Sequence, residues 1–129
     1  MLASSSYDYA IVRVVPSVER EECINVGVIL FCRTRRFLAA LTNLDVQRLK
    51  ALAPGLDLAA LEEHLERIPL ICAGGREAGP IGLLSQAERF HWLVAPSSTM
   101  IQCSAVHSGI CREPEDALRR LFKSMVLLV

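Results

Sequence analysis

The first third of the chain consists of apolar runs separated by short polar segments. Residues 7–15 are rich in aromatic and β-branched side chains and stop at Pro16, which predicts a strand that is apolar on both faces and therefore central in its sheet. The polar residues 17–22 predict a loop. Residues 23–32 and 37–42 predict two more strands, so that the three segments form an antiparallel meander.

The side chains of residues 23–32 separate by parity, because successive residues of a strand point to opposite faces. The odd-numbered set is interrupted by Asn25 and Gly27. The even-numbered set predicts one continuous apolar face made of Ile24, Val26, Val28, Leu30 and Cys32.

Helical spacing replaces this alternation after the third strand. Asn43 or Asp45 can cap a short helix, and Asp57 can cap a second helix that ends or kinks at Pro69. Residues 73–82 contain four of the seven glycines and predict a loop.

The last third of the chain carries the signals of two helices and one strand. Residues 85–88 (SQAE) match a capping box, in which the Ser and Glu side chains satisfy free backbone N–H groups, and open a helix over residues 86–94. Residues 99–107 predict a fourth strand, followed by a turn at residues 108–109. Pro114 opens a last helix, because proline fits the first helical position.

The resulting order, β-β-β-α-α-α-β-α, predicts an α+β fold. We expect one antiparallel or mixed sheet of about four strands with the helices packed on one face, and the fourth strand beside the first. A length of 129 residues fits a single domain over residues 1–129. Residues 1–6 are small and polar and predict a disordered N-terminal tail.

Composition narrows the class of protein. Hydrophobic residues make up 52% and charged residues 22%, which excludes an intrinsically disordered chain. Lys+Arg and Asp+Glu number 14 each, so a nucleic-acid partner is not expected, although Arg33, Arg35 and Arg36 could touch phosphates. No apolar run approaches the roughly 20 residues that cross a bilayer, so no membrane partner is expected. Five cysteines without a CxxC pair, and no signal peptide, indicate reduced thiols and a cytoplasmic protein.

Arg13 is the most conspicuous polar residue of the predicted sheet, because a charge in a central strand is costly unless it is paired. If the register brings Asn25 beside it, the two form a polar notch that could bind an anion. The alternatives are an internal ion pair with Glu19 or Glu22, or exposure of Arg13 on an open face.

The third helix and the fourth strand supply further candidates. Arg89 should lie toward the rim of the helix, where it could bind an anion. His91 should lie near the boundary between the rim and the core-facing side of that helix. His91 or His107 could act as acid or base, because the pKa of histidine lies near neutrality, although structural roles are common for both. The hydroxyls of Ser98 and Thr99 could bind an anion, but capping or turn duties explain them equally well.

Cys103, His107 and Cys111 are spaced C-x3-H-x3-C, which resembles a set of metal ligands. Four residues of extended strand separate the first two by about 13 Å, too far for one ion. Neither a metal site nor a cofactor is therefore expected, and small buried thiols are the simpler interpretation of the cysteines.

Three segments, YDYAIVRVVP, EREECINVGVILFCRTRRFL and GPIGLLSQAERFHWLVAPSSTMIQCSAVHSG, resemble a bacterial family catalogued as domain of unknown function 3037. The resemblance covers nearly the whole chain and implies a small cytoplasmic protein, often encoded beside a HipA-like kinase-fold protein. Ser97 stands where the family pattern usually has Arg, which weakens an anion site there. Cys23 and Cys103 stand where the family usually has other residues, which argues against thiol chemistry.

Two classes of function follow. The favoured one is a binding or regulatory module that acts with a partner such as the HipA-like protein; a homo-oligomer is compatible with it. The alternative is a small hydrolase or transferase on a phosphate-bearing or nucleotide substrate. In that enzyme Arg13 and Arg89 would bind the anion, and His91 or His107 would be acid or base.

Overall fold

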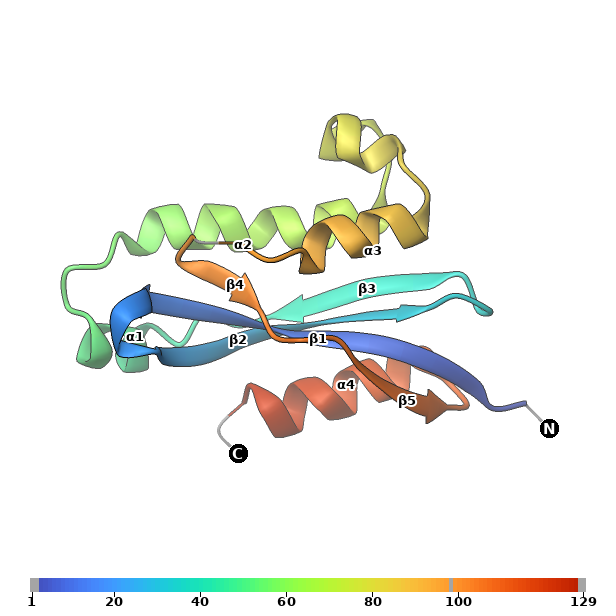
Figure 1. Cartoon of the computed structure of the whole chain (residues 1–129), viewed down its shortest axis with the longest axis horizontal. Coiled ribbons are helices and arrows are strands. Elements are labelled where there is room, and N and C mark those ends of the chain that lie inside the picture. The colour runs from blue at the N-terminus through green and yellow to red at the C-terminus, as the bar shows by residue number, and fades with distance from the viewer. Residues whose placement is uncertain (1–2, 98, 128–129) are drawn as a thin grey trace.

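An antiparallel sheet runs through the centre of the molecule, of which the computed structural model describes residues 3–97 and 99–127 (Figure 1). Its order is β3-β2-β1-β4, and β5 also pairs with β1, nearer the beginning of that strand. The α+β class, the antiparallel sheet and the pairing of the fourth predicted strand beside the first are confirmed. The strands are β1 (Ser5–Ser17), β2 (Glu22–Cys32), β3 (Phe37–Thr42), β4 (Ile101–Cys103) and β5 (His107–Cys111).

The helices begin at the predicted caps. Asp45 accepts a hydrogen bond from the Arg48 backbone, which makes it, rather than Asn43, the cap of the first helix. The capping box of Ser85 and Glu88 is present in full. Pro69 lies inside its helix and does not end it. The helices are α1 (Val46–Leu52), α2 (Leu58–Ala73), α3 (Gln86–Val94) and α4 (Pro114–Met125), with short 3-10 helices at Val18–Arg20, Arg76–Ala78 and Pro80–Leu83.

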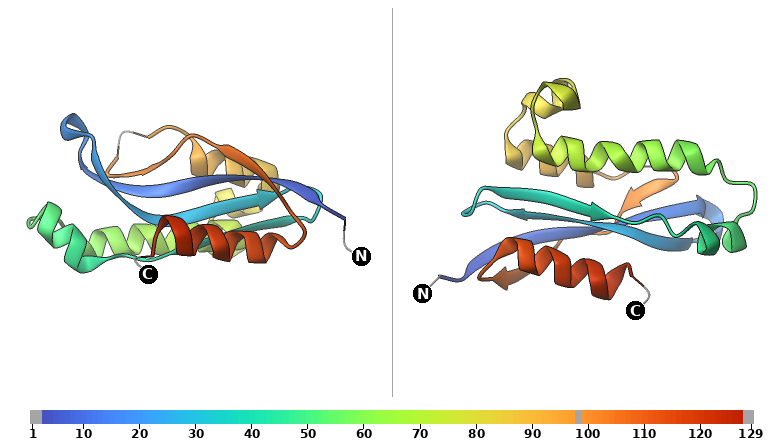
Figure 2. Two further views of the ribbon diagram at one scale, coloured as in Figure 1. Left: turned by 90° about the horizontal axis from the view of Figure 1, so that it is seen from below. Right: turned by 180° about the vertical axis from the view of Figure 1, so that it is seen from behind.

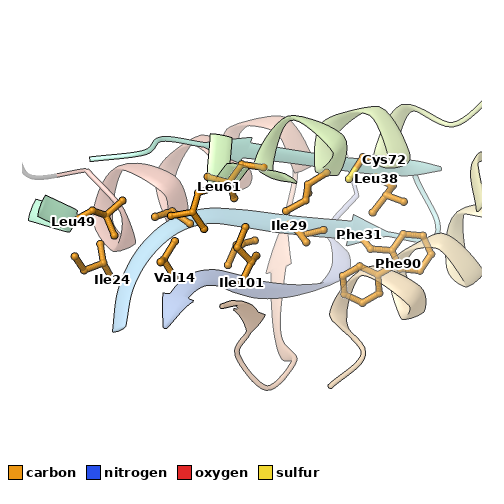
Figure 3. Close-up of a cluster of buried hydrophobic side chains, with 14 residues drawn as sticks. Val14, Ile24, Ile29, Phe31, Leu38, Leu49, Leu61, Cys72, Phe90 and Ile101 are labelled. Carbon is orange, nitrogen blue, oxygen red and sulfur yellow. The ribbon is translucent and has the colours of Figure 1, made fainter. Parts of the chain in front are cut away.

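Helices cover both faces of the sheet, which corrects the expectation that they share one (Figure 2). The central strands are apolar on both sides, so each face requires a cover. On one face α1, α2 and α3 enclose the α2 core: Val12, Val14, Ile24, Val26, Ile29, Phe31, Leu38, Leu49, Leu61, Leu65, Ile68, Cys72, Phe90 and Ile101 (Figure 3). On the other, α4 encloses the α4 core: Tyr7, Val28, Leu30, Cys32, Cys111, Ala117, Leu118, Leu121 and Val126.

A β-bulge divides β2 into two halves of opposite parity. Val12 pairs with Gly27 while the next residue, Arg13, pairs with Asn25, so Val26 has no partner across the ladder. Val26 consequently faces the α2 core and Val28 the α4 core. The predicted continuous face from residue 24 to residue 32 is therefore wrong, because an extra residue reverses the alternation beyond it.

The segment predicted as one fourth strand is two strands. Ser104 interrupts it: its hydroxyl accepts from the Ile11 N–H at 2.9 Å, while its own N–H donates to Ile11 O at 2.8 Å. The predicted turn at residues 108–109 is wrong, because both residues lie inside β5.

The N-terminal segment is also more ordered than predicted. Ser5 and Ser6 belong to β1 and pair with residues 111 and 110 of β5, so the predicted tail is wrong for these two residues. Beside them, the Tyr7 ring covers Gly109, where a Cβ would lie 2.5 Å from the ring. A partner from the far end of the chain therefore orders this segment.

Candidate functional site

The sheet separates the predicted site residues. Arg89 and His91 lie on α3, on the side of the α2 core. Arg13 alternates with the core residue Val12 and therefore faces the α4 side, as does His107, whose ring lies 5.4 Å from that of Tyr9. The structure does not bring the four proposed catalytic side chains into one pocket.

Arg89 is a buried residue rather than a rim residue, with only 8% of its surface exposed. Its Nη1 donates to Leu84 O at 3.1 Å, and its Nη2 donates to Cys72 O at 3.4 Å. The guanidinium packs so closely on Gly74 that a Cβ there would lie 2.4 Å from Nη1. Arg89 thus connects the end of α2 to the segment before α3, which is a structural role.

Both candidate histidines are exposed. His91 lies 6.2 Å from the Phe90 ring, between ring centroids, on the outer surface of α3. His107 pairs with Tyr9, which precedes Arg13 by about 13 Å of extended strand. Neither histidine side chain forms a hydrogen bond or an ion pair within residues 3–97 and 99–127.

Arg13, Asn25 and Gln102 form a polar row across three strands. Arg13 is the register partner of Asn25 in β2 and of Gln102 in β4, so the register does bring Asn25 beside Arg13, which is the condition for a polar notch. The alternative of an ion pair with Glu19 or Glu22 is not seen among the described residues, where Glu22 pairs with Arg20 instead. The buried Nε of Arg13 has no acceptor within the described part of the chain.

A groove of about 280 Å³ lies between α2, α3 and β4, and we call it the α2–α3–β4 groove. Its apolar lining comes from Ile68, Ile71, Leu93 and Ile101. Its polar and aromatic lining includes His64, Arg67, Trp92, Thr99 and Gln102. Trp92, the single tryptophan, is 50% exposed, so the indole belongs to the wall and also faces solvent.

The hydroxyls after α3 serve the turn that closes this groove. The Thr99 N–H donates to Ser97 Oγ at 3.2 Å, and the Thr99 hydroxyl donates to Ile101 O at 2.8 Å. Thr99 also lines the groove while it forms these two hydrogen bonds. Ser98, the other candidate hydroxyl, lies outside the described residues.

Sequence reasoning missed three lining residues of the groove: His64, Arg67 and Gln102. A signal for the first two was present, because α2 lines the groove with residues 64, 67, 68 and 71, one helical stripe. The nearby glutamates 62, 63 and 66 are not part of this lining. The stripe of α2 that faces the groove therefore carries only basic and apolar side chains.

The thiols of Cys72 and Cys103 are poor nucleophiles. Burial raises the pKa of Cys103 to about 11 and that of Cys72 to about 12, although a nearby arginine opposes each shift. Cys103 Sγ also donates to Leu93 O at 3.5 Å. Both thiols are protonated near neutral pH, and only the thiolate attacks electrophiles.

We expect iodoacetamide at pH 8 to modify the exposed Cys23 while Cys103 and Cys72 remain unmodified in the folded protein. At that pH the thiolate fraction of a group with a pKa of 11 is roughly one in a thousand. Time-resolved mass spectrometry measures the modification, with urea-unfolded protein as the control in which all the thiols react. Labelling of Cys103 as fast as that of Cys23 would contradict the conclusion that the Cys103 thiol is unreactive.

Two further features concern metals and membranes. Among residues 3–97 and 99–127, no group of three or more His, Cys, Asp or Glu side chains could hold a metal ion. Cys103 and His107 stand on two separate strands, with Ser104 between them. No helix within the described ranges has the length and apolar character needed to cross a bilayer.

Comparison with known proteins gives one match. The model of the family described as "Protein of unknown function (DUF3037)" matches residues 9–126, almost the whole chain. No curated protein and no solved structure matches the chain significantly.

Proposed function

The chain belongs to the DUF3037 family, and we propose that it is a small binding module that acts with a partner protein through the α2–α3–β4 groove. The family resemblance suggests a HipA-like kinase-fold protein as that partner. It also suggests the bacterial cytoplasm as the location, which agrees with free thiols at all five cysteines.

The position of Trp92 carries this proposal. Half of the surface of Trp92 stays in water, and the residue borders a hollow with an apolar lining. Burial of that exposed apolar area against a partner would be favourable. Tryptophan and arginine are the residues that most often dominate the binding energy of protein interfaces. Trp92 and Arg67 line the same groove, which supports their use as contact residues.

The charge of the groove indicates the chemistry of the partner. His64 and Arg67 lie on the stripe of α2 that faces the hollow, and none of the described residues that line it carries a carboxylate. An apolar side chain next to an aspartate or glutamate would complement this surface. We therefore propose that an acidic segment of the partner, with one apolar anchor, occupies the groove.

Co-expression with the HipA-like protein, followed by size-exclusion chromatography, tests the proposal. We expect the two proteins to co-elute, and the fluorescence of Trp92 to shift when they mix. Trp92→Ala should weaken binding by roughly thirtyfold, which corresponds to about 2 kcal/mol at a hot spot. Arg67→Glu should weaken it further by opposing an acidic segment.

Leu83→Ala is the matched control, because Leu83 is 70% exposed and does not line the groove. It should bind like the wild type. Separate elution of the wild-type proteins, or equal binding by the Trp92 and Leu83 variants, would contradict the proposal.

A further inference from the structure

We propose that Arg13 and the two amide side chains beside it bind a small oxyanion, a carboxylate or a phosphate group. The three side chains occupy neighbouring register positions on β2, β1 and β4. Asn25 lies at the C-terminal end of α4, where its side chain contacts Met125. Gln102, on the edge strand β4, also borders the α2–α3–β4 groove. The inference does not depend on the partner of the α2–α3–β4 groove.

The row contains more hydrogen-bond donors than acceptors. Asn25 Nδ2 donates to Met125 O at 3.1 Å, and Gln102 Nε2 donates to Thr99 O at 2.9 Å. Each amide keeps a second N–H, because a primary amide has two. Arg13 adds a guanidinium whose buried Nε has no acceptor within the described part of the chain.

No carboxylate compensates Arg13 within the described residues. Their ion pairs join Arg20 to Glu22, Arg35 to Glu113 and Arg119 to Glu115, and none involves Arg13. A buried Nε–H group without an acceptor is costly. An oxyanion would supply the missing acceptor, and hydrogen bonds between charged groups are about twice as strong as neutral ones.

The C-terminal end of α4 is the competing partner for Arg13, because the end of a helix carries a partial negative charge. Two of its carbonyls, however, already accept other hydrogen bonds. Phe122 O accepts from the Val126 and Leu127 N–H groups, and Met125 O accepts from Asn25. The Nε of Arg13 receives no acceptor from this helix end within the described part of the chain.

Nuclear magnetic resonance of the full chain tests the site, because the Nε–H of an arginine gives its own signal. The protein is titrated with inorganic phosphate and, separately, with acetate, at constant ionic strength. We expect saturable shifts of the Arg13 Nε–H and of the Asn25 and Gln102 side-chain amides. The anion that binds more tightly identifies the ligand as a phosphate or a carboxylate.

Arg13→Gln should weaken binding by roughly tenfold to a hundredfold, whereas Arg20→Gln, at an exposed arginine near the same end of the sheet, should not change it. Gln102→Ala should weaken it less and tests the site even if Arg13→Gln does not fold. Absence of a saturable shift in the wild type would overturn the proposal. Equal shifts at Arg20 and Arg13 would do the same, since they would mean that the anion binds any arginine.

Discussion

Replacing Phe90 by alanine should lower the free energy of unfolding by about 3–5 kcal/mol, the range typical of a deleted core aromatic ring. Phe90 is only 2% exposed, and its ring lies 5.3 Å from that of Phe31, between centroids (Figure 3). It anchors α3 to the sheet, so the loss combines transfer of the ring to water with the cavity that remains. Urea denaturation followed by circular dichroism measures the change.

The neighbouring Trp92→Ala is the control, because Trp92 is half-exposed on the same helix. It should lower the free energy of unfolding by less than about 1 kcal/mol. Phe90→Leu should lower the free energy of unfolding by an amount between those of Phe90→Ala and Trp92→Ala, since leucine fills part of the cavity. If Phe90→Ala cost no more than Trp92→Ala, the α2 core would not depend on α3.

Replacing Arg89 by alanine should lower the free energy of unfolding by about 2–3 kcal/mol, because two carbonyls lose a charged donor. Those carbonyls belong to Cys72 at the end of α2 and to Leu84 before α3. The segment between them should loosen locally. Limited trypsin digestion should therefore cut after Arg76 faster in the variant than in the wild type.

Arg89→Lys should recover only part of the loss, because an ammonium group cannot reproduce the planar fork that reaches both carbonyls. Arg119→Ala is the matched control, since Arg119 forms an exposed ion pair with Glu115 on α4. Such surface pairs contribute about 0–1 kcal/mol. Wild-type stability and wild-type digestion of Arg89→Ala would show that the two contacts are unimportant.

Elements with local signals could be predicted from the sequence, and those with distant partners could not. The capping box at Ser85 and Glu88 predicted the start of α3, because its hydrogen bonds join neighbouring residues. The break at Ser104 gave no such signal, since its hydroxyl bonds Ile11, 93 positions earlier in the chain. The bulge at Val26 was equally hidden, because it shows only in the register against β1.

The candidate site shows the same division. The sequence placed Arg13 and Asn25 on neighbouring strands, but the register that brings them together shows only in the structure. Arg89 was misplaced because its two acceptors come from segments outside its own helix. The α2–α3–β4 groove was missed because β4 completes it, and β4 comes long after α2 in the chain.

The division of the sheet between two cores has a consequence for synthesis of the protein on the ribosome. The α2 core can be assembled once Ile101 has emerged, whereas the α4 core needs the last helix. Before α4 docks, one face of the nearly complete sheet exposes an uncovered apolar surface that includes Val28, Leu30 and Cys32. A nascent chain at this stage exposes an apolar surface to which other molecules can bind. The interval before α4 docks is therefore the period in which the chain is most prone to aggregate.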